Sequence, residues 1–158
     1  MMDYSGRQFG NYRLLRLLGQ GAFAHVYLGE HVHLGTKAAI KILHTHLTDD
    51  AIEAFRREAR MVALLTHPHI IRILDFGVEA QIPFLVMEYA PYGTLRQRHP
   101  RGTRLPLETV LSYTRQIADA LQYAHDHKVI HRDTKPENIM YCYPCQGYLH
   151  GHRGEMAR

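Results

Sequence analysis

The pattern of apolar and polar positions predicts β-strands in the first half of the chain. Apolar-rich runs of strand length, bounded by glycine or turn residues, are typical of strands. Such runs cover residues 12–18, the stretch that follows Gly21 up to Leu28, and residues 37–43. Two more, residues 70–74 and 82–89, follow at some distance. We therefore expect five strands before the chain reaches residue 90.

Two other segments, residues 49–65 and 106–127, repeat apolar residues at steps of three and four, which predicts helices with one buried face. The expected buried faces consist of Ile52, Phe55, Ala59 and Val62 in the first helix, and of Val110, Ile117, Leu121 and Ala124 in the second. Asp49 and Asp50 would lie in the first turn of the earlier helix, where negative charge is favoured. The short stretch Lys128-Val129-Ile130 is expected to be a buried strand.

Composition narrows the class of protein. The 158 residues can form one ordinary domain, and 46% apolar content is enough for a core. A net charge of +4 suits nucleotide phosphates or nucleic acid equally well. The two cysteines are too few for a disulfide framework, and no apolar run reaches membrane-spanning length. With no secretory signal at the N-terminus, these features predict a cytoplasmic chain without a membrane segment.

The polar stretch from His131 to Asn138 carries candidate chemistry. Phosphoryl transfer needs a carboxylate near the accepting hydroxyl, an amide oxygen for magnesium and a cation near the transferred group. Asp133, Asn138 and Lys135 are of these types. Asp133 and Asn138 stand five positions apart, as in the pattern His-Arg-Asp-x-x-x-x-Asn. The alternative interpretation is a polar turn shaped by Pro136.

On these residues the chain resembles the front half of a bacterial-type serine/threonine protein kinase domain. Lys135, two positions after Asp133, is the residue typical of serine/threonine kinases, whereas Thr134 stands where Leu is usual. The resemblance implies an α+β, protein-kinase-like fold: an antiparallel sheet N-lobe with one helix and the beginning of a helical C-lobe. The predicted divisions are an extension (1–11), the N-lobe (12–87), a hinge (88–91), a partial C-lobe (92–140) and an atypical tail (141–158).

Two further motifs support the resemblance. Gly19 and Gly21 match a kinase glycine loop in which Ala24 replaces the third glycine. We expect both glycines to let the backbone approach phosphates and to adopt positive φ. Lys41 ends an Ala-Ile-Lys run, and Ala39, two positions earlier, shares its face of the strand.

The resemblance also implies roles for individual residues. Glu58 would pair with Lys41, with Glu53 as the runner-up, and His131 would support the loop structurally. Asp133 would orient the substrate hydroxyl, Lys135 would steady the γ-phosphate, and Asn138 would bind Mg²⁺. The implied cofactors are ATP and Mg²⁺, and the implied partners are proteins bearing Ser or Thr, with no nucleic acid. The implied ATP-binding residues are Gly19, Gly21, Val26, Ala39, Lys41, Met87, Glu88, Ala90 and Met140.

The end of the chain departs from the kinase pattern. Asp75-Phe76-Gly77 spells the kinase magnesium motif but precedes the catalytic loop, so we interpret it as a strand-to-turn segment without a metal role. No Asp follows Asp133, and the composition changes after Met140. We therefore expect a truncated or frame-shifted kinase sequence. Three hypotheses follow: a kinase by descent, a nucleotide- or partner-binding fragment without turnover, and an inert fragment.

A zinc site is a minor alternative for the tail. Cys142, Cys145 and His150 match three ligands of a zinc knuckle, but Glu155 occupies the fourth expected position. His152 could substitute only with awkward geometry. Five His-x-His pairs are scattered along the chain, and surface histidines explain most of them.

Overall fold

The computed structural model describes residues 3–141 and 148–149, and the chain divides into two compact units. The first unit comprises Met1–Leu64 and Arg72–Tyr89, and the second comprises Leu65–Ile71 and Ala90–Arg158. Cys142, Cys145, His150, His152 and Glu155, the residues of the zinc alternative, lie outside the described residues.

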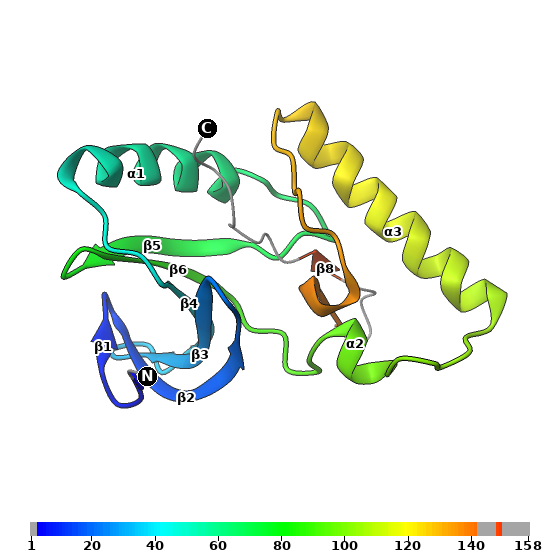
Figure 1. Ribbon diagram of the computed structural model, residues 1–158, viewed down its shortest axis with the longest axis horizontal. Helices are drawn as coiled ribbons and strands as arrows, with labels where there is room; N and C mark the ends of the chain where they lie inside the picture. Colours follow the sequence, from blue (N-terminus) through cyan, green and yellow to red (C-terminus); the bar gives the residue numbers. More distant parts are fainter. Residues whose placement is uncertain (1–2, 142–147, 150–158) are drawn as a thin grey trace. The chain divides into compact units, whose positions relative to one another are not determined.

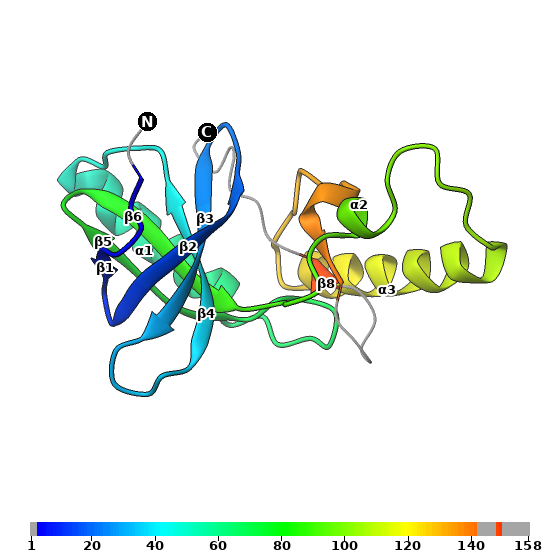
Figure 2. The ribbon, with the colours of Figure 1, turned by 90° about the horizontal axis from the view of Figure 1, so that it is seen from below.

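The first unit is built on a six-stranded antiparallel sheet with the strand order β1-β2-β3-β4-β6-β5. The strands are β1 (Gln8–Phe9), β2 (Tyr12–Gln20), β3 (Ala24–His31), β4 (Lys37–Leu43), β5 (Ile73–Glu79) and β6 (Ile82–Glu88). One helix, α1 (Asp49–Ala63), packs along β5 and β6 (Figure 1). The twist of the sheet is visible in Figure 2. The predicted antiparallel lobe with one helix is thereby confirmed.

The core of the first unit is formed by side chains of several strands, and it includes one residue that precedes Tyr12. Phe9, on β1, is 1% exposed and stacks edge-on against Phe84 of β6. The chain before Tyr12 therefore adds a strand and a core side chain to the sheet, although no sequence motif marks it. The buried cluster is formed by Phe9, Tyr12, Leu14, Tyr27, Ala38, Ile40, Ile42, Phe84 and Val86.

Helix α1 follows its predicted pattern. Phe55 and Ala59 are buried, and Ile52 and Val62 are half-buried, so the expected apolar stripe faces the sheet. The helix begins after Thr48, and Asp49 and Asp50 occupy its first turn, where their charges complement the helix dipole.

The strand predicted for residues 70–74 is wrong in its limits, since β5 begins at Ile73. Ile70 packs against the core of the second unit, so the start of this apolar run serves another core. Asp75-Phe76-Gly77 lies inside β5, paired with residues 84–86 of β6, and the turn comes later, at Ala80 and Gln81, which both have positive φ.

The second unit is mainly helical. Its elements are α2 (Leu95–Arg98), α3 (Leu107–Asp126), the 3₁₀-helix η1 (Pro136–Asn138), β7 (Ile139–Met140) and β8 (Tyr148–Leu149). Its core forms where α2, α3 and β7 meet, with Leu95, Ala120 and Ile139 buried together. Thr94 starts α2 with a capping box that it shares with Gln97. In the described part of the chain, no helix combines the length and apolar character needed to cross a bilayer.

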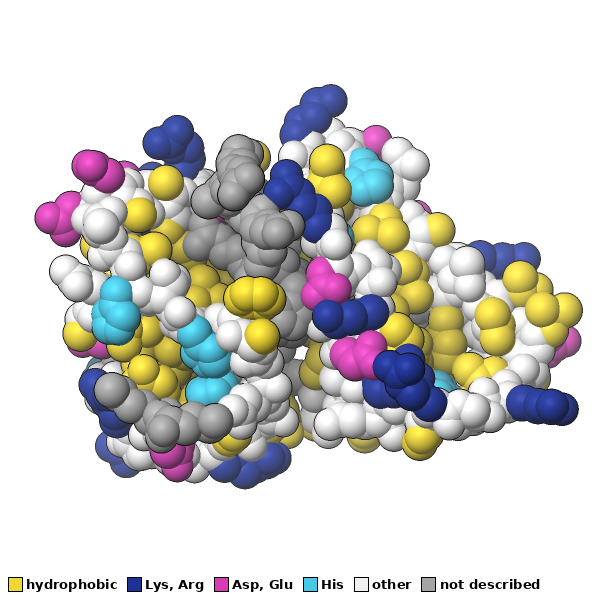
Figure 3. All heavy atoms as spheres, viewed as in Figure 1, with side chains coloured by type: hydrophobic (Ala, Val, Ile, Leu, Met, Phe, Trp, Pro, Cys, Tyr) yellow, Lys and Arg dark blue, Asp and Glu magenta, His cyan; other side chains and the backbone are white. Residues whose placement is uncertain are grey.

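The buried face of α3 agrees with the prediction at Ile117, Leu121 and Ala124 but not at Val110. Val110 is 41% exposed, whereas Ala120 and Ala124 are buried and Ile117 and Leu121 are half-buried. Small alanines let the neighbouring elements approach the middle of the helix, and its first turns extend past them. Hydrophobic side chains are accordingly visible on the surface of the second unit in Figure 3.

The strand expected over residues 128–130 is also wrong. Helix α3 ends in a turn, since the N–H groups of Lys128 and Val129 donate to the carbonyls of His125 and Ala124. Lys128 has φ +63°, which turns the chain, and Ile130 is 63% exposed. Two apolar residues, Val129 and Ile130, are too few to specify a strand when a helix terminus uses the backbone groups beside them.

Candidate functional site

The glycine loop is the turn between β2 and β3. Gly19 still pairs with Val26 within the sheet, and the Gly21 N–H donates to the Ala24 carbonyl at 2.9 Å, which closes the turn. Gly19 and Gly21 do not have positive φ, so that expectation is wrong. The glycines leave space instead. A Cβ on Gly19 would meet nothing within 4 Å, and one on Gly21 would meet only the Ala24 carbonyl at 3.5 Å.

Four of the predicted nucleotide-binding side chains share one face of the sheet. Val26 lies directly opposite Lys41, and Ala39 lies directly opposite Met87, and directly opposed residues project to the same face. Ala39 and Lys41 are two apart on β4 and so project together. Lys41 is fully buried, at 0% exposure, whereas Val26 is half-buried.

The two candidate partners for Lys41 differ in burial. Glu53 is exposed and forms an ion pair with Arg56 at 2.8 Å on the surface of α1. Glu58 is half-buried and lies between the buried residues Phe55 and Ala59 in sequence. A buried ammonium is stable only when a charged or polar partner compensates for its lost hydration. These observations favour Glu58 over Glu53.

The residues predicted for the adenine contact lie where the first unit ends and the second begins. Met87 is 3% exposed and Ala90 is 9% exposed. The Glu88 N–H donates to the Arg72 carbonyl at 3.1 Å, and the Glu88 carboxylate accepts from the Arg72 N–H at 3.4 Å. Neither of these two bonds to Arg72 uses the Glu88 carbonyl.

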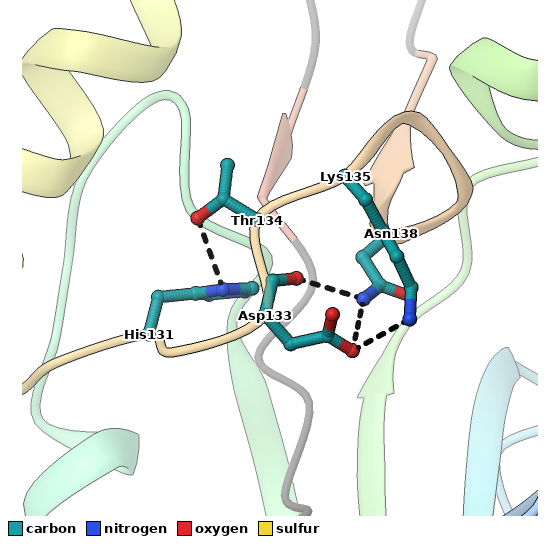
Figure 4. Close-up of polar contacts among 5 residues, drawn as sticks. All are labelled: His131, Asp133, Thr134, Lys135 and Asn138. Carbon is teal, nitrogen blue, oxygen red and sulfur yellow. Dashed lines mark hydrogen bonds and ion pairs between the residues drawn. The ribbon is translucent and has the colours of Figure 1, made fainter.

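The catalytic loop, in the second unit, brings its three predicted residues together (Figure 4). The Asn138 Nδ2 group donates to the backbone carbonyl of Asp133 and to its Oδ2, both at 2.9 Å. The Lys135 ammonium contacts the same Oδ2 at 2.9 Å. Asn138 is 4% exposed, whereas the side chains of Asp133 and Lys135 are 43% and 48% exposed. A buried amide thus holds a carboxylate that solvent can reach.

Local backbone geometry shapes this loop. Arg132 has φ +60°, a conformation that costs free energy in a non-glycine residue and reverses the chain just before Asp133. The Asp133 N–H donates to the His131 carbonyl at 2.8 Å, and His131 Nδ1 lies 3.4 Å from the Thr134 hydroxyl. His131 therefore contacts the loop itself, in keeping with the supporting role expected for it.

The side-chain oxygen of Asn138 is suited to bind a metal ion. Because Nδ2 makes both hydrogen bonds to Asp133, the amide orientation is fixed, and Oδ1 forms no hydrogen bond to another described residue. Oxygen donors of this kind are the ligands that Mg²⁺ prefers. Within the described ranges, no group of three or more His, Cys, Asp or Glu residues could hold a metal ion.

Two supports of the loop carry no signal in the sequence. Arg96 of α2 forms an ion pair with Glu137 of η1 at 2.9 Å, and this hydrogen bond lowers the pKa of the Glu137 carboxyl. The Gly93 carbonyl accepts from the Tyr141 N–H at 2.8 Å. Met140, half-buried, pairs with Tyr148 on β8 and bridges to Thr94. More than 40 positions of sequence separate Arg96 from Glu137, Gly93 from Tyr141 and Thr94 from Met140, so only the fold brings these partners together.

Comparison with known proteins establishes the family. The protein kinase domain model matches residues 12–146, which is most of the chain and six residues beyond the limit that the motifs suggested at Met140. This chain belongs to the protein kinase domain family. Its curated relatives are bacterial serine/threonine-protein kinases, and the expected resemblance is confirmed.

Individual relatives show how much of a kinase is represented. The chain is 42% identical to Pkn1 of Myxococcus xanthus over 85% of its own length and 19% of that protein. It is 40% identical to PrkC of Bacillus subtilis over 83% of its length and 20% of that protein. The crystal structure of the Mycobacterium tuberculosis PknI kinase domain is similar with a TM-score of 0.80 and 30% identity, over 93% of this chain and 61% of that one. The chain therefore spans about a fifth of the curated relatives' length and about three fifths of the solved kinase domain.

Proposed function

We propose that these residues form the nucleotide-binding and catalytic-loop part of a serine/threonine protein kinase that acts on cytoplasmic protein substrates. The observation that carries the proposal is the catalytic loop, where Asp133 is held by Asn138 and paired with Lys135. A carboxylate, a cation and an available amide oxygen are the groups that phosphoryl transfer to a hydroxyl requires. When bound, ATP with Mg²⁺ supplies the phosphoryl group and neutralises part of its negative charge.

In this proposal each residue of the loop has one task. Asp133 orients the Ser or Thr hydroxyl and accepts its proton, since its carboxylate is partly exposed and held from behind by Asn138. Asn138 would offer Oδ1 to Mg²⁺. Lys135 forms an ion pair with the Asp133 carboxylate in this structure. Its side chain is flexible, so in the presence of ATP it could contact the γ-phosphate instead.

The first unit supplies most of the proposed nucleotide contacts. Gly19 and Gly21 leave room for phosphates, and the sheet face with Val26, Ala39, Lys41 and Met87 would receive adenine and the α- and β-phosphates. Glu58 would hold Lys41 in place. Glu88 and Ala90 would contact the adenine edge through their backbone groups, and Met140 would add a contact from β7.

Nucleotide binding tests this assignment directly. Lys41→Met should weaken Mg²⁺-ATP binding and reduce the ATP-dependent rise in Tm, because the ammonium that neutralises phosphate charge is gone. Glu58→Ala should do the same in part, whereas its matched control Glu53→Ala should not, since Glu53 pairs with Arg56 on the surface. Equal ATP affinity in wild type and Lys41→Met would remove Lys41 from the site.

A second candidate is nucleotide binding without turnover by these 158 residues alone. It is favoured by one sequence observation: no Asp follows Asp133, so the carboxylate that kinases use to hold Mg²⁺ after the catalytic loop is not among these residues. We propose that the chain in this form binds ATP but transfers phosphate very slowly or not at all. A radiolabelled phosphotransfer assay with a generic Ser/Thr substrate separates the two candidates.

A further inference from the structure

Two histidines, His25 and His44, lie beside the glycine loop. The turn spans residues 21–23, between the end of β2 and the start of β3. In the β3–β4 ladder Ala24 pairs with Leu43, so His44 comes next to the turn. The His44 N–H donates to the Phe23 carbonyl at 2.9 Å, and His44 Nδ1 lies 3.1 Å from the Ala22 carbonyl.

The chemistry of the second contact defines the state of the ring. A carbonyl oxygen can only accept, so His44 Nδ1 must carry the proton and donate it to Ala22. The neutral Nδ1–H tautomer and the imidazolium both do so. Phe23, at the tip of the turn, is 65% exposed, so packing of its side chain does not anchor the turn. The turn is held instead by the hydrogen bonds from His44 and by the backbone hydrogen bond from Gly21 to Ala24.

The ring of His25 packs against the ring of His44. The two rings meet edge to face, with centroids 4.2 Å apart and planes at 82°. His25 is 5% exposed, and its Nδ1 has no hydrogen-bond partner among the described residues. Burial lowers the pKa of His25, the charge of His44 lowers it further, and Asp3 opposes both. Burial thus favours the neutral form of His25, whose ring also meets that of Tyr27 edge to face at a centroid distance of 6.3 Å.

We propose that His44, seated against His25, is a positioning residue that holds the glycine loop in the conformation that receives nucleotide phosphates. The inference rests on the proposed function for its ligand, and on the His44–Ala22 and His44–His25 contacts for its mechanism. His44 touches the backbone of the loop and not the proposed ligand. Its removal should therefore affect the phosphate end of a nucleotide and leave the adenosine end unchanged.

The variants are chosen to separate a tether from a general effect on folding. His44→Leu removes the donor. His44→Asn keeps one, because the Asn Nδ2 occupies nearly the place of His Nδ1 along the side chain. His46→Leu, an exposed position two residues further on, is the matched control. Because His44 is itself exposed, all three variants should fold, which a Tm measurement verifies.

Two measurements on the whole chain are expected to agree. Amide hydrogen exchange of residues 21–25 without nucleotide should be faster in His44→Leu by about three- to tenfold, the effect of losing one ordinary hydrogen bond. The dissociation constant for ATP should rise by about the same factor while that for adenosine stays unchanged. His44→Asn should recover most of both effects, and His46→Leu should match the wild type.

The outcomes that would overturn the proposal are distinct from failure of the proposed function. Unchanged loop exchange in His44→Leu, or a parallel loss of ATP and adenosine binding, would refute the positioning role. Failure of Asn to restore either readout would also refute it. If the wild type binds no ATP, the proposed function fails and the phosphate role fails with it, while the exchange data still decide whether His44 tethers the loop.

Discussion

The Asn138 amide is a buried donor whose two hydrogen bonds both end on Asp133. A buried polar group that loses its partner costs free energy, and a carboxylate next to another carboxylate costs more because like charges repel. The contact between these two side chains is therefore sensitive to what stands at position 138.

We predict that Asn138→Ala lowers the free energy of unfolding by about 1–2 kcal/mol. Asn138→Asp should cost more at pH 7, because it can neither donate to Asp133 nor avoid its charge. Its excess cost should shrink towards pH 4, where one carboxyl of the pair takes a proton and can donate it. Urea denaturation at the two pH values measures both effects, and an Asp variant as stable as wild type at pH 7 would show that the amide hydrogen bonds contribute little.

Two glycines on adjacent strands, Gly19 of β2 and Gly29 of β3, should differ in how much an alanine substitution changes stability. A Cβ on Gly29 would lie 2.6 Å from Ile40 Cγ1, inside the buried cluster, whereas a Cβ on Gly19 would meet nothing within 4 Å. We expect Gly29→Ala to destabilise the first unit by about 1–3 kcal/mol through overpacking. Gly19→Ala should change the free energy of unfolding little. Chemical denaturation of the two variants provides the comparison, and equal stabilities would contradict the packing argument.

The buried His25 gives the chain a pH-dependent stability. Its pKa is lowered in the folded state, chiefly by burial, while in the unfolded chain it is about 6.5. Above that value His25 is neutral in both states. As the pH falls below it, the unfolded chain binds a proton that the folded chain resists, so stability is lost.

We therefore predict that His25→Phe flattens the pH dependence of stability between about pH 7 and pH 5. The free-energy difference between wild type and variant should move in favour of the variant as the pH falls. Denaturation curves at three pH values across this window measure the difference. Parallel profiles for the two proteins would show that His25 titrates alike in the folded and unfolded states.

At the scale of elements, helix α3 has one buried and one exposed face, and they can be compared by substitution. Ala120 is 0% exposed and packs with Leu95 and Ile139, whereas Val110 is 41% exposed. We predict that Ala120→Leu destabilises the second unit by about 1–3 kcal/mol, since the packed core has no room for three more carbons. Val110→Lys, the matched surface change, should stay within about 0.5 kcal/mol of wild type. If urea denaturation shows that Val110→Lys destabilises the protein more than Ala120→Leu, then Val110 belongs to the buried face, as the periodicity predicted.

At the scale of the whole molecule, most of the proposed nucleotide residues, Lys41 among them, belong to the first compact unit, whereas Asp133 belongs to the second. We predict that Lys41→Met reduces the ATP-dependent rise in Tm, whereas Asp133→Asn leaves it intact, because Asp133 is proposed to act on the hydroxyl and not to bind the nucleotide. Phosphotransfer by the wild-type chain should stay at background. Asp133-dependent phosphorylation of a Ser/Thr substrate by this chain alone would overturn that expectation.

The sequence by itself determined the class of protein and the elements that carry its motifs. Spacing along the chain predicted that Ala39 and Lys41 share one face of a strand, because alternate residues of a strand project to the same side. Periodicity predicted α1 and its buried face, since Phe55 and Ala59 repeat with the period of a helix whose whole length packs on the sheet.

Tertiary structure alone decided what depends on partners distant in sequence. The exposure of Val110 follows from where Leu95 of α2 and Ile139 of β7 pack on α3, which is at Ala120. The division of residues 70–74 between the two compact units, and the turn at Lys128 in place of a strand, depend on neighbours that short runs of apolar residues do not encode. The His44–Ala22 and Arg96–Glu137 contacts join residues 22 and 41 positions apart, and only the folded chain brings such side chains within hydrogen-bonding distance.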